Sequence, residues 1–187
     1  MLFLKNGFTF IELLITMSVM AIVVAVALPN FSEQIKDSRS EALGEEFSSA
    51  LNYARMEAVK RSSRVSVCAS SNGADCSDDW TDGWIVFLDY ANADNVAPVT
   101  ELSGASFIIK RWGKAATSSE ISVKSNGTDV NFVRFTSLGA LARLNNPPTT
   151  VVIKARIQGC SGNKARQLTV GISGVVNVAN IACSAIF

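Results

Sequence analysis

The chain has 187 residues, 48% of them hydrophobic, and a formal net charge of +1. This length fits one ordinary domain with an appended segment, and so small a net charge neither indicates nor excludes a nucleic-acid partner. Histidine is absent, which removes the commonest general base, the Ser-His and Cys-His nucleophile pairs and the His-containing zinc sites. We therefore expect a protein that is not an enzyme and has no cofactor or metal, rather than a membrane-anchored envelope enzyme.

The first predicted element is an apolar segment from Phe8 to Leu28 that contains one carboxylate, Glu12. A helix of this length spans ~31 Å, close to the hydrocarbon thickness of a bilayer. A cleaved secretory signal would have a shorter apolar core, so the pattern predicts an uncleaved membrane helix. A carboxylate costs about 2.5–3.5 kcal/mol near the centre of such a helix and somewhat less toward its end. Glu12 is therefore a functional candidate that needs a partner.

The second predicted element is an amphipathic helix. Beyond Pro29 the apolar residues recur with the 3.6-residue period as far as Val59, and most charged residues fall on other faces. Pro29 should kink or loosen the helix, and Gly44 is a second weak point. A single helix from Phe8 to about Lys60 would be ~80 Å long; the alternative is a membrane anchor followed by a separate core helix. In both cases the apolar stripe must be buried against other elements.

The rest of the chain is predicted to be rich in strands. Short apolar or alternating runs are bounded by Gly, Asn, Asp or Pro, at 64–68, 84–88, 107–112, 121–124, 132–135, 151–157, 167–172 and 175–178. Ser173-Gly174 is typical of a hairpin turn, and Ala142–Thr150 is the most loop-like stretch. One long helix followed by eight strands predicts an α+β fold, with antiparallel sheets packed on the C-terminal half of the helix.

The four cysteines fall into two groups along the sequence, Cys68 with Cys76 and Cys160 with Cys183. An even number in a chain with an export signal indicates disulfides in an oxidising compartment. Three connectivities are open; we favour the two neighbouring pairs because each flanks one loop or hairpin. A Cys₄ zinc site is the rival interpretation, but it lacks the usual CxxC spacing.

Charge is distributed unevenly along the chain. Residues 130–187 contain six basic residues and no acidic one, whereas four aspartates gather in one loop. The basic side chains Lys154, Arg156, Lys164 and Arg166 are candidates for a positive interaction face. The acidic residues, Asp75, Asp78, Asp79 and Asp82, lack the register of an EF-hand, which favours a solvated loop over a calcium site.

The residues "GFTFIE", Gly7 to Glu12, resemble the prepilin signature of type IV pilins and type II secretion pseudopilins. The resemblance implies that a prepilin peptidase cuts between Gly7 and Phe8 on the cytoplasmic side and that Phe8 is N-methylated. It also implies that, in a filament, the carboxylate of Glu12 meets the N-terminal ammonium of a neighbouring subunit's Phe8. A buried charge is costly unless it is paired, so Glu12 would set the axial register of assembly.

Two further stretches resemble the GspH/FimT group of minor pilins and pseudopilins. They are "VSVCASSNGADCSDDWTDGWIVFLD" from Val65 and "CSGNKARQLTVGISGVVNVANIAC" from Cys160. The resemblance implies a leader at 1–7, a transmembrane and assembly half of the helix at 8–28, an amphipathic half at 29–62 and a β-rich globular domain at 63–187. It further implies a single-pass protein of the bacterial inner membrane, with the globular domain in the periplasm before the chain enters a pilus or pseudopilus.

The terminal hairpin departs from this group in one respect. Members of this group that bind DNA carry a motif resembling Gly-Arg-x-Arg at the turn of this hairpin. This chain instead has Gly174, Val175, Val176 and Asn177. We therefore favour contact between the positive face and an acidic neighbouring pilin over contact with DNA. The leading hypothesis is a FimU/FimT-like minor pilin that helps to initiate pilus assembly at the filament tip, together with other minor pilins and the major pilin. The alternatives are a GspH-like pseudopilin of type II secretion and a DNA-binding minor pilin of natural transformation.

Overall fold

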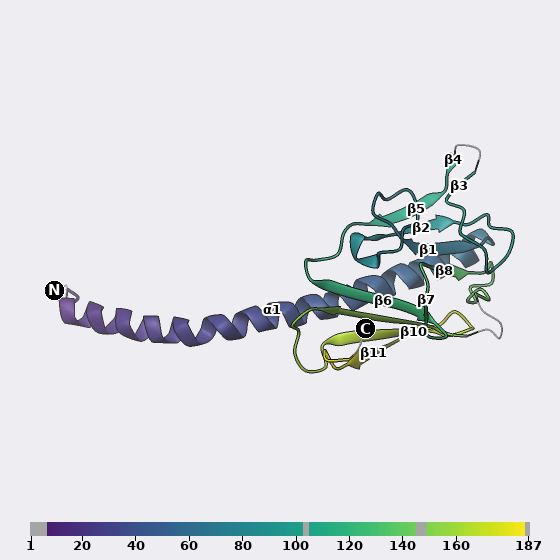
Figure 1. Ribbon diagram of the computed structural model, residues 1–187. Coiled ribbons are helices and arrows are strands. Elements are labelled where there is room, and N and C mark those ends of the chain that lie inside the picture. Colours follow the sequence, from purple (N-terminus) through teal and green to yellow (C-terminus); the bar gives the residue numbers. More distant parts are fainter. Residues whose placement is uncertain (1–6, 103–104, 145–148, 186–187) are drawn as a thin grey trace, which may run out of the picture. The chain divides into compact units, whose positions relative to one another are not determined.

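The computed structural model describes residues 7–102, 105–144 and 149–185, without the side chains of residues 26–30, 102, 105 and 106. The leader up to Asn6 and part of the loop predicted at 142–150 lie outside the described residues, as does the side chain of Pro29, where we predicted a kink. The chain divides into two compact units, Met1–Ile35 and Lys36–Phe187, which we call the N-terminal unit and the head unit (Figure 1).

The helix α1, Phe10–Arg61, contributes to both units. It is one helix, as predicted, instead of a membrane anchor followed by a separate core helix. Within the head unit its buried apolar residues recur three, four or seven positions apart, as the 3.6-residue period requires. They are Leu43, Phe47, Ala50, Leu51, Ala54 and Ala58.

The strands of the head unit form antiparallel sheets. The first contains four strands in the order β5-β2-β1-β8, the second contains five in the order β11-β10-β9-β6-β7, and β3 and β4 form a short separate pair. The bounds are β1 Val65–Ala69, β2 Trp84–Leu88, β3 Glu101–Leu102, β4 Ala105–Ser106, β5 Ile108–Trp112, β6 Ser119–Ser125, β7 Thr128–Asp129, β8 Phe132–Phe135, β9 Val151–Ile157, β10 Ala165–Val170 and β11 Val176–Ile181, with a 3₁₀ turn η1 at Trp80–Asp82.

Each of the eight predicted strands is present, and the α+β prediction is confirmed. The strands that the sequence did not predict, β3, β4 and β7, have two residues each, too few for an alternating pattern to be visible. The predicted hairpin turn is also present: the N–H of Gly171 donates to the carbonyl of Val175 (2.9 Å), and the N–H of Gly174 donates to that of Gly171 (2.8 Å).

One core joins α1 to both larger sheets. The ring of Phe47 lies 5.3 Å from that of Trp80 and 4.9 Å from that of Trp84, and the same cluster includes the inward residues of β9, such as Ile153. Along β9 alternate residues are buried, so one face of the five-stranded sheet covers the helix. The amphipathic part of the helix is thus buried against antiparallel strands from Leu43 to Ala58, as expected, whereas Phe31, Ile35 and Val59 of the predicted apolar stripe are exposed.

Candidate functional site

The N-terminal unit begins with a capping box formed by Thr9 and Glu12. The N–H and the hydroxyl of Thr9 both donate to Oε2 of Glu12, at 3.3 and 3.4 Å, and the N–H of Glu12 donates to the hydroxyl of Thr9 at 3.3 Å. These reciprocal bonds satisfy backbone donors that a helix otherwise leaves unpaired at its start. In this single subunit, the exposed Glu12 carboxylate therefore caps its own helix.

The peptide bond before Phe8 is open. Gly7 is exposed, and a Cβ placed on it would have no heavy atom within 4 Å. Phe8 is also exposed. Both residues that flank the predicted cleavage bond are therefore exposed.

Apolar side chains are exposed on all sides of the described part of this unit. They include Phe8, Phe10, Ile11, Leu13, Leu14, Ile15, Met17, Val19, Met20, Ile22, Val23 and Val24. An exposed apolar surface of this extent marks an interaction site, and burying one such side chain fully stabilises a complex by roughly 1.5–3 kcal/mol. Among the described residues, no helix combines enough length with enough apolar character to cross a membrane.

Two of the four predicted contact residues bind α1 of their own chain. Lys164 pairs with Glu41 at 3.0 Å, and Arg166 pairs with Glu41 at 3.3 Å and with Glu45 at 3.6 Å. The hydrogen bond from Lys164 holds the pKa of Glu41 below its ordinary value of 4.5. Arg166 is buried, so it joins β10 to the helix and does not present its charge outward.

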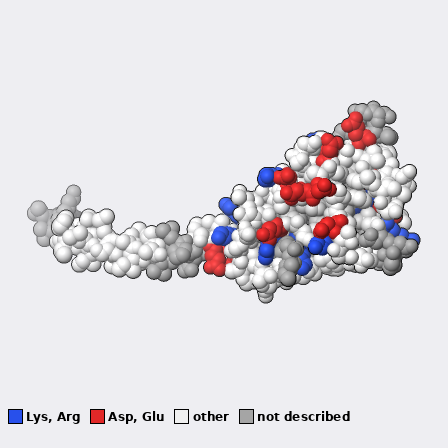
Figure 2. Space-filling view, in the orientation of Figure 1, with Lys and Arg blue, Asp and Glu red and all other residues white. Residues whose placement is uncertain are grey.

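The other two residues lie on β9. The guanidinium of Arg156 pairs with Glu120 at 2.5 Å and also donates to the carbonyl of Cys183. Lys154 is half-buried, opposite Gln167 and Ser122 on the neighbouring strands. On the face of the head shown in Figure 2, basic and acidic side chains lie next to one another and do not form one continuous basic surface.

The comparisons with known proteins agree with this arrangement. Residues 43–175 match the family described as type II transport protein GspH, and residues 3–28 match the prokaryotic N-terminal methylation motif. The chain belongs to the GspH family. It is a minor pilin or pseudopilin, and membership implies assembly with other pilins and processing by a prepilin peptidase.

Two solved structures resemble this GspH-family chain, both of the type IV minor pilin FimU of Pseudomonas aeruginosa strain PAO1. One has a TM-score of 0.53 and 21% identity, and covers 76% of this chain and 89% of FimU. The other has a TM-score of 0.48 and 23% identity, and covers 73% of this chain and 89% of FimU. The first likeness confirms the pilin-like fold. No curated protein matches the chain.

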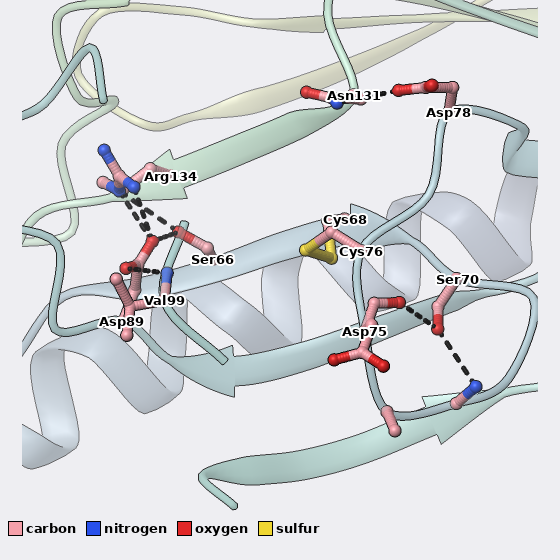
Figure 3. Close-up of a disulfide and its surroundings, with 12 residues drawn as sticks. Ser66, Cys68, Ser70, Asp75, Cys76, Asp78, Asp89, Val99, Asn131 and Arg134 are labelled. Atoms are coloured by element: carbon pink, nitrogen blue, oxygen red, sulfur yellow. Dashed lines mark hydrogen bonds and ion pairs between the residues drawn. A yellow bond between two sulfur atoms is a disulfide. The ribbon is translucent and has the colours of Figure 1, made fainter. Parts of the chain in front are cut away.

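The GspH-family head also contains a buried ion pair that the sequence did not reveal (Figure 3). Arg134 and Asp89 have fully buried side chains, with Nη2 and Nε of the arginine 2.7 and 2.8 Å from Oδ2 of the aspartate. The hydroxyl of Ser66 donates to the same oxygen at 2.5 Å. Arg134 contributed to the basic count of residues 130–187, yet its charge is neutralised inside the fold.

This pair also fixes the loop that follows β2. Arg134 donates to the carbonyls of Ala93, Asp94 and Val96, while Oδ1 of Asp89 accepts the N–H groups of Ala91 and Val99. A buried charge is tolerated when its remaining hydrogen-bonding capacity is satisfied in this way. No short-range pattern could have shown the pairing, because the two residues lie on β8 and just beyond β2, far apart in sequence.

The cysteines form two disulfides, Cys68–Cys76 and Cys160–Cys183. This is the pairing of sequence neighbours that we favoured, and it leaves no free cysteine for the rival zinc site. The first bridge closes the short loop after β1 (Figure 3). The second joins the loop before β10 to the end of the chain after β11.

The aspartates of the loop at 75–82 take up separate structural roles. Asp75 accepts a hydrogen bond from Asn72, Asp78 from Asn131, and Asp82 pairs with Lys114. Asp79 caps η1 by accepting the N–H and hydroxyl of Thr81, which lower its pKa. Among the described residues, no group of three or more acidic or cysteine side chains is arranged to hold a metal ion.

Proposed function

We propose that this protein is a minor pilin that helps to initiate assembly of a type IV pilus at the filament tip. A prepilin peptidase would remove residues 1–7, and the helix would be held in the inner membrane, with the head unit in the periplasm, until the subunit enters the filament. The observation that carries the proposal is an exposed apolar helix that begins with an exposed carboxylate. This supports a structural role, exerted through assembly, and not a catalytic one.

Glu12 would act as the register device. Cleavage after Gly7 gives Phe8 a new ammonium group, which N-methylation would leave positively charged. In the free subunit the carboxylate of Glu12 bonds only to Thr9 among the hydrogen bonds observed for it. In a filament, the ammonium of a neighbouring Phe8 would replace this contact. A buried carboxylate without that cation costs several kcal/mol, so a subunit out of register would be rejected.

The test of this role is the variant Glu12→Ala in the full-length chain. It should reach the membrane and be cleaved after Gly7, yet fail to enter filaments. Thr9→Ala is the matched control, because it removes the two hydroxyl bonds of the capping box but keeps the carboxylate; it should still be incorporated. Incorporation of Glu12→Ala at the level of the unaltered protein would contradict the register role.

A second candidate function is favoured by the family match itself, whose description is a type II transport protein. In that case the chain is a minor pseudopilin of type II secretion. A deletion strain scored together for surface pili, protein export and transformation separates the candidates. Loss of pili with normal export supports the minor pilin, whereas loss of export with normal pili supports the pseudopilin. Loss of transformation alone would contradict both.

A further inference from the structure

Five exposed apolar side chains gather where α1 ends in the head unit. Met56 and Val59 belong to α1, Leu138 to the turn after β8, and Ile172 and Val175 to the turn between β10 and β11. Leu138 is 86% exposed and Met56 63%. We call these five residues the apolar patch. Single exposed apolar residues are common, but a cluster drawn from three segments marks an interaction site.

The contacts of Arg55 show that these segments meet. Its Nε donates to the carbonyl of Gly139 at 3.0 Å, and its Nη2 donates to that of Ser173 at 3.4 Å. The N–H of Leu141 also donates to the carbonyl of Ile172 at 3.0 Å. The two turns are therefore hydrogen-bonded to each other and to the helix, so the three segments that carry the patch lie side by side.

Two glycines allow this close approach. A Cβ on Gly139 would lie 2.8 Å from Cγ2 of Val59, and a Cβ on Gly174 would lie 1.8 Å from the carbonyl oxygen of Gly139. Their φ angles of 75° and 77° lie in the left-handed region that favours glycine. The close approach of the backbone at these two glycines thus sets the positions of the segments that carry the patch.

The charge beside the patch is positive. Arg55 and Lys60 line the same shallow depression of about 330 Å³ as Met56 and Val59. The nearby carboxylate of Glu57 pairs with Arg61 at 2.5 Å and with Lys60 at 3.5 Å, but its side chain is only 9% exposed, against 74% for Lys60, so the ammonium group and not the carboxylate lies at the surface. A surface that covers the depression therefore meets cations and apolar groups.

We propose that the apolar patch is the docking surface for the globular part of another filament subunit, and that the docked surface is apolar with acidic side chains at its rim. This inference rests on the proposed function. Apolar contact would supply the affinity, and charge complementarity would select the partner and its orientation. DNA fits the patch less well, because its binding requires several cations on phosphates, whereas Arg55 is already bonded to two carbonyls.

The first test uses the full-length protein in cells, with a photo-crosslinking amino acid at Leu138. Thr117 is the matched control: it is exposed, and it precedes β6 at the end of the five-stranded sheet opposite the β10–β11 turn. We expect an adduct from position 138 and none from 117. Mass spectrometry should identify the partner as another pilin, crosslinked at an apolar segment flanked by Asp or Glu. Equal adducts at both positions, or an adduct only with DNA or lipid, would overturn the proposal.

The second test uses substitutions that leave the core intact. Leu138→Asp and Lys60→Glu each oppose the expected partner chemistry, and Thr117→Asp is their control. We expect Leu138→Asp and Lys60→Glu to lower the crosslinked pilin adduct at least tenfold, measured with the photo-crosslinker at Val175, without changing the amount of cleaved, disulfide-bonded subunit. An unchanged adduct overturns the docking surface.

The proposed function and the docking surface can fail separately. If deletion of the protein leaves assembly and secretion normal, the proposed function fails. If deletion abolishes assembly, but expression of the Leu138→Asp variant in the deletion strain restores assembly fully and keeps the crosslinked pilin adduct, only the docking surface fails.

Discussion

The side chain of Arg166 lies directly over Gly44 of α1. A Cβ on Gly44 would be 2.4 Å from both Cβ and Cγ of Arg166, closer than real side chains approach. The sequence suggested that Gly44 is a weak point of the helix, and this interpretation was incomplete. The missing side chain makes room for the arginine that joins β10 to Glu41 and Glu45.

Gly44→Ala should therefore destabilise the protein although alanine is the better helix former. Overpacking costs about 1–3 kcal/mol, against a propensity gain of roughly 1 kcal/mol, so we expect a net loss of up to ~2 kcal/mol. Urea unfolding of the full chain in detergent measures it. Gly113→Ala is the control, because a Cβ there meets no atom within 4 Å. Equal stability of the two variants would show that β10 adjusts without cost.

Removing one member of the buried pair between Arg134 and Asp89 should be the most destabilising single change in the head unit. Arg134→Met leaves the carboxylate of Asp89 buried without its cation, at a cost of about 3–5 kcal/mol. The same substitution at the exposed Arg143 should change stability by less than about 0.5 kcal/mol. The unfolding midpoints of the two variants in urea give the comparison. A loss at Arg134 no larger than at Arg143 would contradict a structural role for the pair.

The contact between Glu41 and Lys164 should make stability depend on pH. Because the pKa of Glu41 is lower in the folded chain than its ordinary value of 4.5, its contribution is complete above that value. This contribution is lost as the pH falls through the lower pKa of the folded chain, because over this range the carboxyl group binds a proton more readily in the unfolded chain. When unfolding is measured between pH 3 and 7, the free energy of unfolding should therefore fall less on acidification in Glu41→Gln than in the unaltered chain. Glu46→Gln, at an exposed position, is the control and should lose as much stability on acidification as the unaltered chain.

The two disulfides should contribute unequally. Cys160 and Cys183 are separated by 23 positions, and Cys68 and Cys76 by 8. The chain-entropy relation gives slightly more than ~3 kcal/mol for the longer loop and somewhat less than ~3 kcal/mol for the shorter one. Replacing each pair with serine and measuring urea unfolding tests this order.

The longer disulfide loop also holds α1, which should give its removal a local signature. The N–H and hydroxyl of Ser161 donate to the carboxylate of Asp37 at 2.7 and 2.8 Å. Without the bridge between Cys160 and Cys183, hydrogen exchange at Ser161 should accelerate more than exchange in β1. Uniform acceleration across both regions would contradict this local effect.

Local patterns were sufficient to predict the long helix and the eight longer strands of this protein. The 3.6-residue period beyond Pro29 predicted the buried face of α1, and alternation in segments such as Val151–Ile157 predicted the strands. The stretch from Gly7 to Glu12 carried the family resemblance that the comparisons then confirmed. These properties are local because helix and strand periodicity is set by neighbouring residues along the chain.

Only the tertiary structure decided what the charged residues do. The sequence grouped Arg134, Lys164 and Arg166 into one basic block, but each pairs with a carboxylate far earlier in the chain. The patch around Leu138 was equally hidden, because its members come from three segments that meet only in the fold. Electrostatic pairing and surface contiguity depend on distance in space, which sequence spacing does not encode. The sequence alone therefore determined the family, the helix and the longer strands, while the fold determined which surface remains for a partner.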